Sequence, residues 1–306
     1  MSIDKPEQGL TDAQAAVCQA AVLFVNLHKK NACLLRDEIR HSLDKKGISV
    51  TEFCFEGRPG DFPCGSWDIA FSLGGDGTVL YTARTAAVLG IPIFPLNLGT
   101  LGFITGVEKE NWLRVFNSWL AGQAKVSRRC MLEISVYRGA ERAAHYCCLN
   151  DTVVSASGIA KLIRLDVLSR GACGETVELG PYRCDGLIIA TPTGSTAYSM
   201  AAGGPILDPE MEAMILNPIC PLTLSNRPIV LPATQNLEII VAQQQRSGVL
   251  LTIDGQDTFS LNSDDRIVIS QAPYQAVLIS SGRKAYYEAL CTKLNWAEKN
   301  NGETNA

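Results

Sequence analysis

The stretch DIAFSLGGDGTVLYTARTAAVLG, residues 68–90, decides the fold. Its first part, Asp68–Leu73, is an apolar run of strand length, and the turn GGDG follows it directly. A segment with helical character, Thr78–Leu89, comes next and is ended by Gly90. An apolar strand that leads through a tight turn into a helix indicates an α/β domain, in which helices connect parallel strands.

The residues around this stretch repeat the same alternation. Leu34, Leu35, Ile39 and Leu43 recur at the helical period, and Gly47 follows them as a stop signal. The expected elements are a strand at Ala20–Leu27, a helix at Asn31–Lys46, and strands at Ile48–Phe55 and Ile91–Leu96. Strands that are apolar throughout and separated by helices indicate a parallel sheet covered on both faces.

The pattern changes after about Lys125. Apolar residues now alternate with polar neighbours, as at Leu132, Ile134 and Val136, and the turn signal Asp254-Gly255 appears. The same character marks the runs Ile163–Val167, Leu237–Ala242, Val249–Ile253, Arg266–Ile269 and Ala276–Ile279. Alternation with turn signals predicts an antiparallel β domain. We therefore expect an α/β domain over 1–125 and a β-rich domain over 126–279.

The C-terminal tail returns to a helical pattern. Over Lys284–Trp296, residues Tyr287, Leu290 and Leu294 share one face. The last residues, NNGETNA, are expected to be disordered.

Composition excludes several classes of protein. The 27 Lys and Arg against 31 Asp and Glu give a net charge of −4, so the chain lacks the basic field of a nucleic-acid-binding protein. The uncharged stretches 85–107 and 186–207 are interrupted by glycine and proline, so neither predicts a membrane helix. The first residues, MSIDKPEQGLTDAQ, contain no signal-peptide core. The eleven Cys are an odd number without a Cys-x-x-Cys pair, which indicates buried, reduced thiols and a cytoplasmic protein.

The GGDGT turn is the first candidate for chemistry. It lies at the carboxyl end of a strand, the edge where open α/β sheets bind ligands. The glycines Gly74, Gly75 and Gly77 let a phosphate approach the backbone, and the helix that begins at Thr78 offers free N–H groups. Asp76 would repel phosphate unless it holds a cation or takes a proton from an attacking hydroxyl. A tight turn in which Asp76 caps the helix is the alternative.

Three further segments carry polar groups at strand ends. NLGTLGF, residues 97–103, would place a flexible loop beside the first turn, and a plain glycine loop is its alternative. In 185–205, DGLIIATPTGSTAYSMAAGGP, a strand at Leu187–Ala190 opens into hydroxyl side chains that could bind a polar ligand, and Tyr198 could stack on a ring. A solvated Ser/Thr loop is the alternative. Asn150-Asp151 could read a ribose, or form an ordinary turn.

Together these segments resemble the bacterial NAD kinase family. The chain contains GGDGT, NLGTLGF, LNDTVVS, DGLIIATPTGSTAYSMAAGGPI and NPICPLTLSNRPIVLP in the family's order, and the resemblance runs from about Phe71 to the terminal KLNW. GGDGT alone also occurs in diacylglycerol, sphingosine and 6-phosphofructo-type kinases. The resemblance implies an N-terminal Rossmann-like α/β domain, a C-terminal antiparallel β-rich domain, the dinucleotide bound between them, and a C-terminal helix, within 280–306, that returns to the first domain.

The implied reaction transfers the γ-phosphoryl group of ATP to the 2′-hydroxyl of the adenosine ribose of NAD, with a divalent cation, expected to be Mg²⁺. Asp76 matches the family's proton acceptor, and Gly74, Gly75 and Thr78 belong to its phosphate loop. The positions that match NAD contacts are Asp76, Gly77, Asn150, Asp151, Lys161, Arg183, Asp185, Thr196, Ala197, Tyr198, Ser199, Met200, Ala201 and Gln256. The resemblance also implies a homo-oligomer, a dimer or a tetramer.

Two positions depart from the family pattern. Tyr81 stands where many members carry a basic residue, and Asp151 replaces the commoner Glu. Two other functions remain as alternatives: a lipid or sugar kinase that shares the GGDGT turn, and a non-catalytic NAD-binding sensor. The choice between ATP and polyphosphate as donor, and between NAD and NADH as acceptor, stays open at this point.

Overall fold

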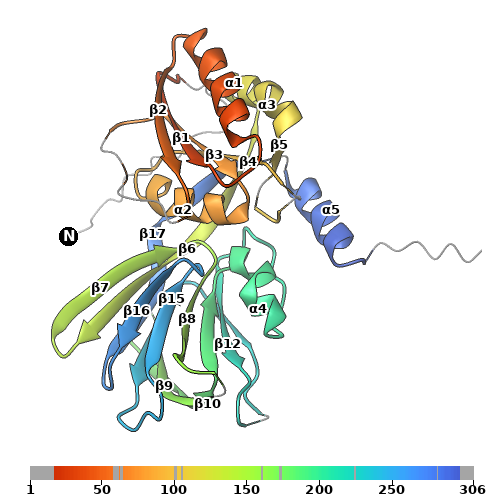
Figure 1. Cartoon of the computed structure of the whole chain (residues 1–306). Coiled ribbons are helices and arrows are strands. Elements are labelled where there is room, and N and C mark those ends of the chain that lie inside the picture. Colours follow the sequence, from red (N-terminus) through yellow and green to blue (C-terminus); the bar gives the residue numbers. More distant parts are fainter. Residues whose placement is uncertain are drawn as a thin grey trace, which may run out of the picture. The chain divides into compact units, whose positions relative to one another are not determined.

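A computed structural model describes residues 17–57, 62, 65–99, 102–104, 106–159, 161–171, 174–223, 225–280 and 282–296 (Figure 1). The chain forms two compact units. Unit 1 takes the described residues of 1–78, 93–127 and 279–306, and unit 2 takes 79–92 and 128–278. Residues 79–92, expected in the first domain, thus group with the second unit. The expected disorder of the last residues lies outside the described residues.

Unit 1 contains the parallel sheet that the sequence predicted. Its strands are β1 (Ala20–Asn26), β2 (Ser49–Phe55), β3 (Ile69–Gly74) and β4 (Ile93–Asn97), in the order β4-β3-β1-β2. All three pairings are parallel. A short strand, β5 (Val107–Glu108), adds to β4. Each predicted strand here is confirmed to within two residues at either end.

Helices of unit 1 bury apolar stripes. Helix α1 (Ala32–Asp44) buries Leu35, Ile39 and Leu43 in the core that also contains the strand residues. The sequence analysis missed α3 (Trp112–Leu120), which follows the short 3₁₀ turn η1 (Lys109–Asn111) and buries two aromatic side chains. The apolar residues of α3 (Trp112, Val115, Phe116, Trp119 and Leu120) recur at the helical period, so its signal was present in the sequence and was overlooked.

Helix α2 (Asp76–Ala86) follows β3 after Gly75. It begins two residues before the predicted start and ends three before the predicted end, since residues 87–90 form a turn. Asp76 therefore lies inside the first turn of the helix, where the aligned peptide dipoles favour a negative charge.

Unit 2 consists of antiparallel strands, as predicted. One sheet has the order β13-β12-β11-β8-β15-β16, made of β8 (Asp151–Ala156), β11 (Gly186–Ala190), β12 (Ala213–Ile219), β13 (Ile229–Pro232), β15 (Val249–Ile253) and β16 (Asp257–Leu261). The other strands are β6 (Lys125–Arg138), β7 (Glu141–Cys148), β9 (Ile163–Arg170), β10 (Thr176–Cys184), β14 (Asn236–Val241) and β17 (Arg266–Ser280). The two predicted runs at 266–269 and 276–279 are one continuous strand, β17, rather than two.

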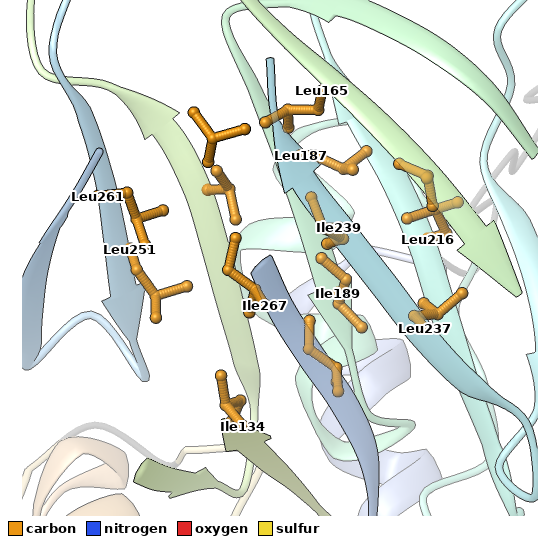
Figure 2. Packing of buried hydrophobic residues seen from close by; sticks show 14 of the residues in the cluster. Ile134, Leu165, Leu187, Ile189, Leu216, Leu237, Ile239, Leu251, Leu261 and Ile267 are labelled. Atoms are coloured by element: carbon orange, nitrogen blue, oxygen red, sulfur yellow. The ribbon is translucent and has the colours of Figure 1, made fainter. Parts of the chain in front are cut away.

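The core of unit 2 contains side chains from both sets of strands. Figure 2 shows Leu165 and Ile239 beside Leu187, Ile189 and Leu216, all buried in one cluster. This cluster supports the strands that end at the candidate site described below.

The tail forms the predicted helix, α5 (Arg283–Lys293), and belongs to unit 1. Lys293, the last residue of α5, contacts Phe103 of the same unit: its Nζ lies 4.2 Å from the centre of the Phe103 ring. The prediction that Tyr287, Leu290 and Leu294 form the buried face of this helix is partly wrong. Leu290 is buried, but Tyr287 is 41% exposed, and Ala289 is buried instead. Among the described residues, no helix has the length and apolar character needed to cross a membrane.

The described cysteines are all free thiols. Cys130, Cys148 and Cys184 are buried, as expected of small apolar side chains. The expectation is wrong for three others, which are exposed: Cys33, Cys54 and Cys220.

Candidate functional site

In unit 1 the GGDGT turn needs glycine for a steric reason. A Cβ on Gly74 would collide with the side chain of Thr78, whose backbone N–H donates to Gly75 O at 2.9 Å. The Thr78 hydroxyl in turn accepts a 3.3 Å hydrogen bond from Asn26 Nδ2 at the end of β1. The turn is therefore packed tightly between two strand ends, and its first helical residue is Asp76.

The carboxylate of Asp76 joins the GGDGT turn to the second glycine loop. Its Oδ2 accepts the Phe103 N–H at 2.9 Å and its Oδ1 accepts the Ile104 N–H at 3.3 Å. A Cβ on Gly102 would collide with the same carboxylate. The prediction that NLGTLGF lies beside the first turn is confirmed for residues 102–104; Thr100 and Leu101 lie outside the described residues.

In unit 2 the pair Asn150–Asp151 stands at the start of β8, and its backbone is held from two sides. The buried carboxylate of Asp254 accepts N–H groups from Leu149 (3.1 Å), Asn150 (2.8 Å) and Asp151 (3.2 Å). On the carbonyl side, Thr191 donates its hydroxyl to Leu149 O at 2.5 Å and its N–H to Asn150 O at 2.8 Å. Sequence reasoning did not single out Asp254, which it read only as part of a turn.

Two buried acids thus lie close together in this unit. Burial, and after it the charge of Asp254, raise the pKa of the Asp151 carboxyl to about 7. Burial also raises the pKa of Asp254, to about 6. The backbone N–H groups and Arg84 act in the opposite direction, because they favour the charged form of Asp254. Strongly perturbed carboxyl groups of this kind are typical of ligand or catalytic sites.

The hydroxyl-rich segment is not a solvated loop. Residues Thr193–Thr196 form a 3₁₀ turn (η2) and Tyr198–Ala201 a short helix (α4). Most of its hydroxyl groups are buried: Thr191, Thr193, Ser195, Thr196 and Ser199. The hydroxyls of Ser195 and Thr196 donate to carbonyls of the same turn, at 2.6 and 3.2 Å. Tyr198 is 50% exposed, so its ring is accessible for stacking.

Three buried polar atoms in or next to this segment lack a hydrogen-bond partner among the described residues. They are Asn150 Oδ1, Thr193 Oγ1 and the Oδ1 of Asn217, whose Nδ2 donates to Ser199. The segments are in direct contact, because a Cβ on Gly194 would collide with the Asn150 backbone. A buried polar atom without a partner is costly unless a ligand or water satisfies it. Thr193 is therefore a candidate that sequence reasoning missed, although it lies within TPTGSTAYS.

Gln256 follows the Asp254-Gly255 turn, and its side-chain oxygen accepts a 2.9 Å hydrogen bond from Arg84 Nη2. Arg84 also forms an ion pair with Asp257. It lies at the end of α2, which sequence reasoning treated only as a helix. This contact fixes the oxygen side of the Gln256 amide.

The structure does not bring every predicted residue together. In the β8–β11 pairing Ala190 is opposite Asp151, whereas Gly186 is opposite Ser155. Asp185 is thus level with Ala156 at the other end of β8, roughly 16 Å from Asp151 at about 3.3 Å per residue. Arg183 lies further away along the chain, in β10. Lys161 is exposed in the loop between β8 and β9. The described residues contain no group of three or more His, Cys, Asp or Glu side chains that could hold a metal ion.

Comparison with known proteins identifies two family segments. The model of the ATP-NAD kinase N-terminal domain matches residues 62–124, and that of the ATP-NAD kinase C-terminal domain matches residues 149–281. Among curated proteins, the NAD kinase of Treponema denticola is 40% identical over 93% of this chain and 99% of its own. The NAD kinase of Geobacter sulfurreducens is 39% identical over 76% of this chain and 80% of its own.

Solved structures agree on the fold. Yeast NADH kinase complexed with NADH has a TM-score of 0.80 at 22% identity, covering 95% of this chain and 92% of that one. An NAD kinase from Archaeoglobus fulgidus in complex with ATP has a TM-score of 0.67 at 26% identity, covering 89% of this chain and 97% of that one. The family segments and the two curated relatives show that the chain belongs to the NAD kinase family.

Proposed function

We propose that this chain is an NAD kinase that transfers the γ-phosphoryl group of ATP to the 2′-hydroxyl of the adenosine ribose of NAD, forming NADP. The observation that carries the proposal is the carboxylate of Asp76, set in a glycine turn at the carboxyl end of β3 and held by the backbone N–H groups of Phe103 and Ile104. A carboxylate at a phosphate-binding turn suits proton transfer from a hydroxyl nucleophile.

Asp76 acts as the proton acceptor in this proposal. A ribose hydroxyl is a weak nucleophile, and most of the rate gain in phosphoryl transfer comes from holding it in line with the γ-phosphorus. General-base assistance contributes a further ~10²–10⁴-fold. The two hydrogen bonds from the neighbouring loop orient the carboxylate, while Gly74, Gly75 and Thr78 form the turn that receives phosphate.

The reaction also requires a divalent cation in this proposal, with Mg²⁺ as the best fit. Mg²⁺ takes oxygen ligands and is commonly bound through one or two carboxylates together with substrate phosphates. Because Asp76 is assigned as the proton acceptor, the cation would take its oxygen ligands mainly from the phosphates of ATP and from water. Bound there, the cation would neutralise charge on the phosphates.

Asn150 and Asp151 bind the dinucleotide in this proposal. Asn150 Oδ1 is buried and lacks a partner among the described residues, so it can accept a hydrogen bond from the ligand. Charged Asp151 can accept hydrogen bonds from ribose hydroxyls. The other proposed NAD contacts are Asp76, Gly77, Lys161, Arg183, Asp185, Thr196, Ala197, Tyr198, Ser199, Met200, Ala201 and Gln256.

The alternative functions explain less. A lipid or sugar kinase would share the GGDGT turn alone, whereas the two family segments cover residues 62–124 and 149–281. A non-catalytic sensor has no use for a carboxylate at the phosphate turn, yet Asp76 is present and held in place.

We also propose that the protein is a cytoplasmic homo-oligomer, a dimer or a tetramer. The free thiols of the described cysteines favour a reducing compartment. Size-exclusion chromatography with light scattering should find two or four chains per particle, and a monomer at micromolar concentration would contradict the proposed assembly.

The function is tested by measuring NADP with a dehydrogenase specific for NADP. Purified protein with NAD, ATP and Mg²⁺ should produce NADP, and omission of ATP should abolish the signal. Parallel reactions with polyphosphate or NADH identify the preferred donor and acceptor. No NADP with any donor would refute the function.

A further inference from the structure

The turn that joins β15 to β16 contains an acid whose burial the turn itself does not require. Asp254 has φ 49° and is followed by Gly255 at φ 65°, and Gln256 N–H closes the turn on Ile253 O at 2.9 Å. Asp-Gly suits positive φ values in a hairpin turn, where the acid is normally solvated. Here Asp254 is only 7% exposed. Burying a carboxylate is costly unless it is well hydrogen-bonded, so this burial needs another cause.

Asp254 is buried because its carboxylate binds the backbone of residues 149–151, the segment that contains the proposed dinucleotide contacts Asn150 and Asp151. Three consecutive backbone N–H groups, from Leu149 to Asp151, donate to the Asp254 carboxylate, and the Asp254 N–H donates back to Asp151 O at 2.9 Å. Hydrogen bonds to a charged group are stronger than neutral ones. Because Thr191 binds the carbonyls of Leu149 and Asn150, these peptide groups are fixed on both sides.

We propose that Asp254 is a positioning residue, whose carboxylate fixes the backbone of Asn150 and Asp151 and thereby the way in which these two side chains bind NAD. This rests on the proposed function, in which Asn150 and Asp151 contact the dinucleotide. Both oxygens of the Asp254 carboxylate accept backbone N–H groups of this segment. Asp254 acts through the peptide groups, which set where the unpartnered Asn150 Oδ1 and the Asp151 carboxylate point.

The charge of Asp254 has a second effect on Asp151. Asp254 raises the pKa of Asp151 as a neighbouring negative charge, in addition to burial. Three other titratable groups interact with this acid pair: Arg84 from α2 and the thiols of Cys147 and Cys148 from β7. Arg84 favours the charged form of Asp254, while burial and Asp254 raise the pKa of both thiols, and Asp151 also raises that of Cys148. Removing the charge at 254 therefore lowers the pKa of Asp151.

The test compares Asp254→Asn with a matched control, Asp264→Asn, over pH 5.5 to 8.5. Both aspartates have positive φ, which Asn tolerates, so neither change strains the backbone. The side chain of Asp264 accepts an exposed 3.3 Å hydrogen bond from Gln243 Nε2 and lies away from the segment 149–151. Asn at 254 can keep an oxygen toward two of the N–H groups, but its amide NH₂ then faces the third.

For Asp254→Asn at pH 8, the KM for NAD should rise about tenfold or more, while the KM for ATP stays within about twofold. In wild type the KM for NAD should rise as pH falls through about 7, since the charged form of Asp151 binds ribose. The midpoint of that rise should move to lower pH in Asp254→Asn and stay in place in Asp264→Asn. If Asp254 only supported the local fold, Asp254→Asn would raise the KM for NAD without moving the pH midpoint of that rise.

An unchanged KM for NAD and an unchanged midpoint in folded Asp254→Asn overturn the proposal, provided that wild type forms NADP. Absence of NADP with wild type would instead refute the proposed function. If circular dichroism shows that Asp254→Asn is unfolded, Asp254→Glu decides, because it keeps the negative charge but moves the carboxylate that accepts the three N–H groups. It should raise the KM for NAD while the KM for ATP stays within about twofold, and an unchanged KM for NAD would overturn the proposal.

Discussion

The side chain of Asp76 accepts the backbone N–H of Phe103 at 2.9 Å, so one carboxylate ties the glycine turn after β3 to the glycine loop after β4. The two segments are 27 residues apart in the sequence. The acid proposed to take the ribose proton is therefore oriented by a loop that contributes no acid or base of its own. Such orientation by neighbouring groups is what catalytic carboxylates require.

Gly102→Ala should reduce kcat at least tenfold. The added Cβ collides with the Asp76 carboxylate, which must swing away and lose its hydrogen bonds to residues 103 and 104. Losing hydrogen bonds to a charged group costs about 1.5–3 kcal/mol. Thermal denaturation should show lower stability for this variant. Gly99→Ala is the matched control for stability, because no atom lies within 4 Å of the added Cβ. Equal stability of the two variants would contradict the collision.

Asp76→Asn should fold but lose most turnover. Asn keeps the size of the side chain, yet it cannot accept a proton, and its NH₂ must face one of the two N–H donors. A loss of ~10²–10⁴-fold in kcat is expected from general-base assistance alone. Steady-state kinetics with a melting curve separates loss of chemistry from loss of fold. A variant that keeps more than about a tenth of wild-type kcat would argue against Asp76 as the base.

Strands β1, β3 and β4 could be predicted because their residues are almost all apolar and buried. Helix α3 was overlooked although Trp112, Phe116 and Trp119 recur at the helical period, because its segment lies outside the strand-turn-helix alternation that guided the other predictions. The strand β17 was divided in two because the polar residues between 269 and 276 mask its continuity. Its pairing with β14 covers only Arg266–Ile269, and β17 also pairs with β6, a long-range partner that no local pattern reports.

The candidate site shows the same limit. Motifs placed Asp76, Asn150 and Asp151 at strand ends, where the structure has them. Asp254 was missed because its role depends on hydrogen bonds to residues about a hundred positions earlier. Arg84 was missed for the same reason, since its partners Gln256 and Asp257 lie far along the chain. A residue that acts through distant backbone or side-chain contacts has no signature in the local sequence.

Thiol accessibility gives a further prediction. Cys33, Cys54 and Cys220 are exposed and should react with a thiol reagent quickly in the native protein. Cys130, Cys148 and Cys184 should react slowly, because burial shields the thiols and raises their pKa. Denatured, unreduced protein should yield all eleven thiols of the sequence. A reproducible count well below eleven would reveal disulfides.

Asp151→Ala should weaken the binding of NAD and leave ATP almost unaffected. A charged hydrogen bond to ribose contributes about 1.5–3 kcal/mol. Its loss raises the KM for NAD roughly ten- to a hundredfold at ~1.4 kcal/mol per decade, if KM follows affinity. Both constants are measured at saturating co-substrate. A raised KM for ATP with an unchanged KM for NAD would show that the two sites are assigned the wrong way round.

The burial of Asp151 also predicts how the stability of the ligand-free protein depends on pH. The folded-state pKa of about 7 lies above the value of 3.8 expected for an unfolded chain. Between about pH 4 and 7 the folded state holds a proton that the unfolded state has released, so this group's contribution to stability is complete below pH 4 and is lost as pH rises through 7. Asp151→Asn removes the titration and keeps the shape of the protonated side chain.

The variant should therefore differ little from wild type near pH 4 and become more stable than wild type at pH 8, by an amount on the order of a few kcal/mol. Urea denaturation at both pH values measures the difference, and the buried acids elsewhere in the chain cancel because both proteins share them. The same variant should bind NAD less tightly at pH 8, since it lacks the carboxylate. A site that binds a ligand at the expense of stability behaves in this way. Equal stability of the two proteins at pH 8 would show that Asp151 ionises in the folded protein as easily as in water.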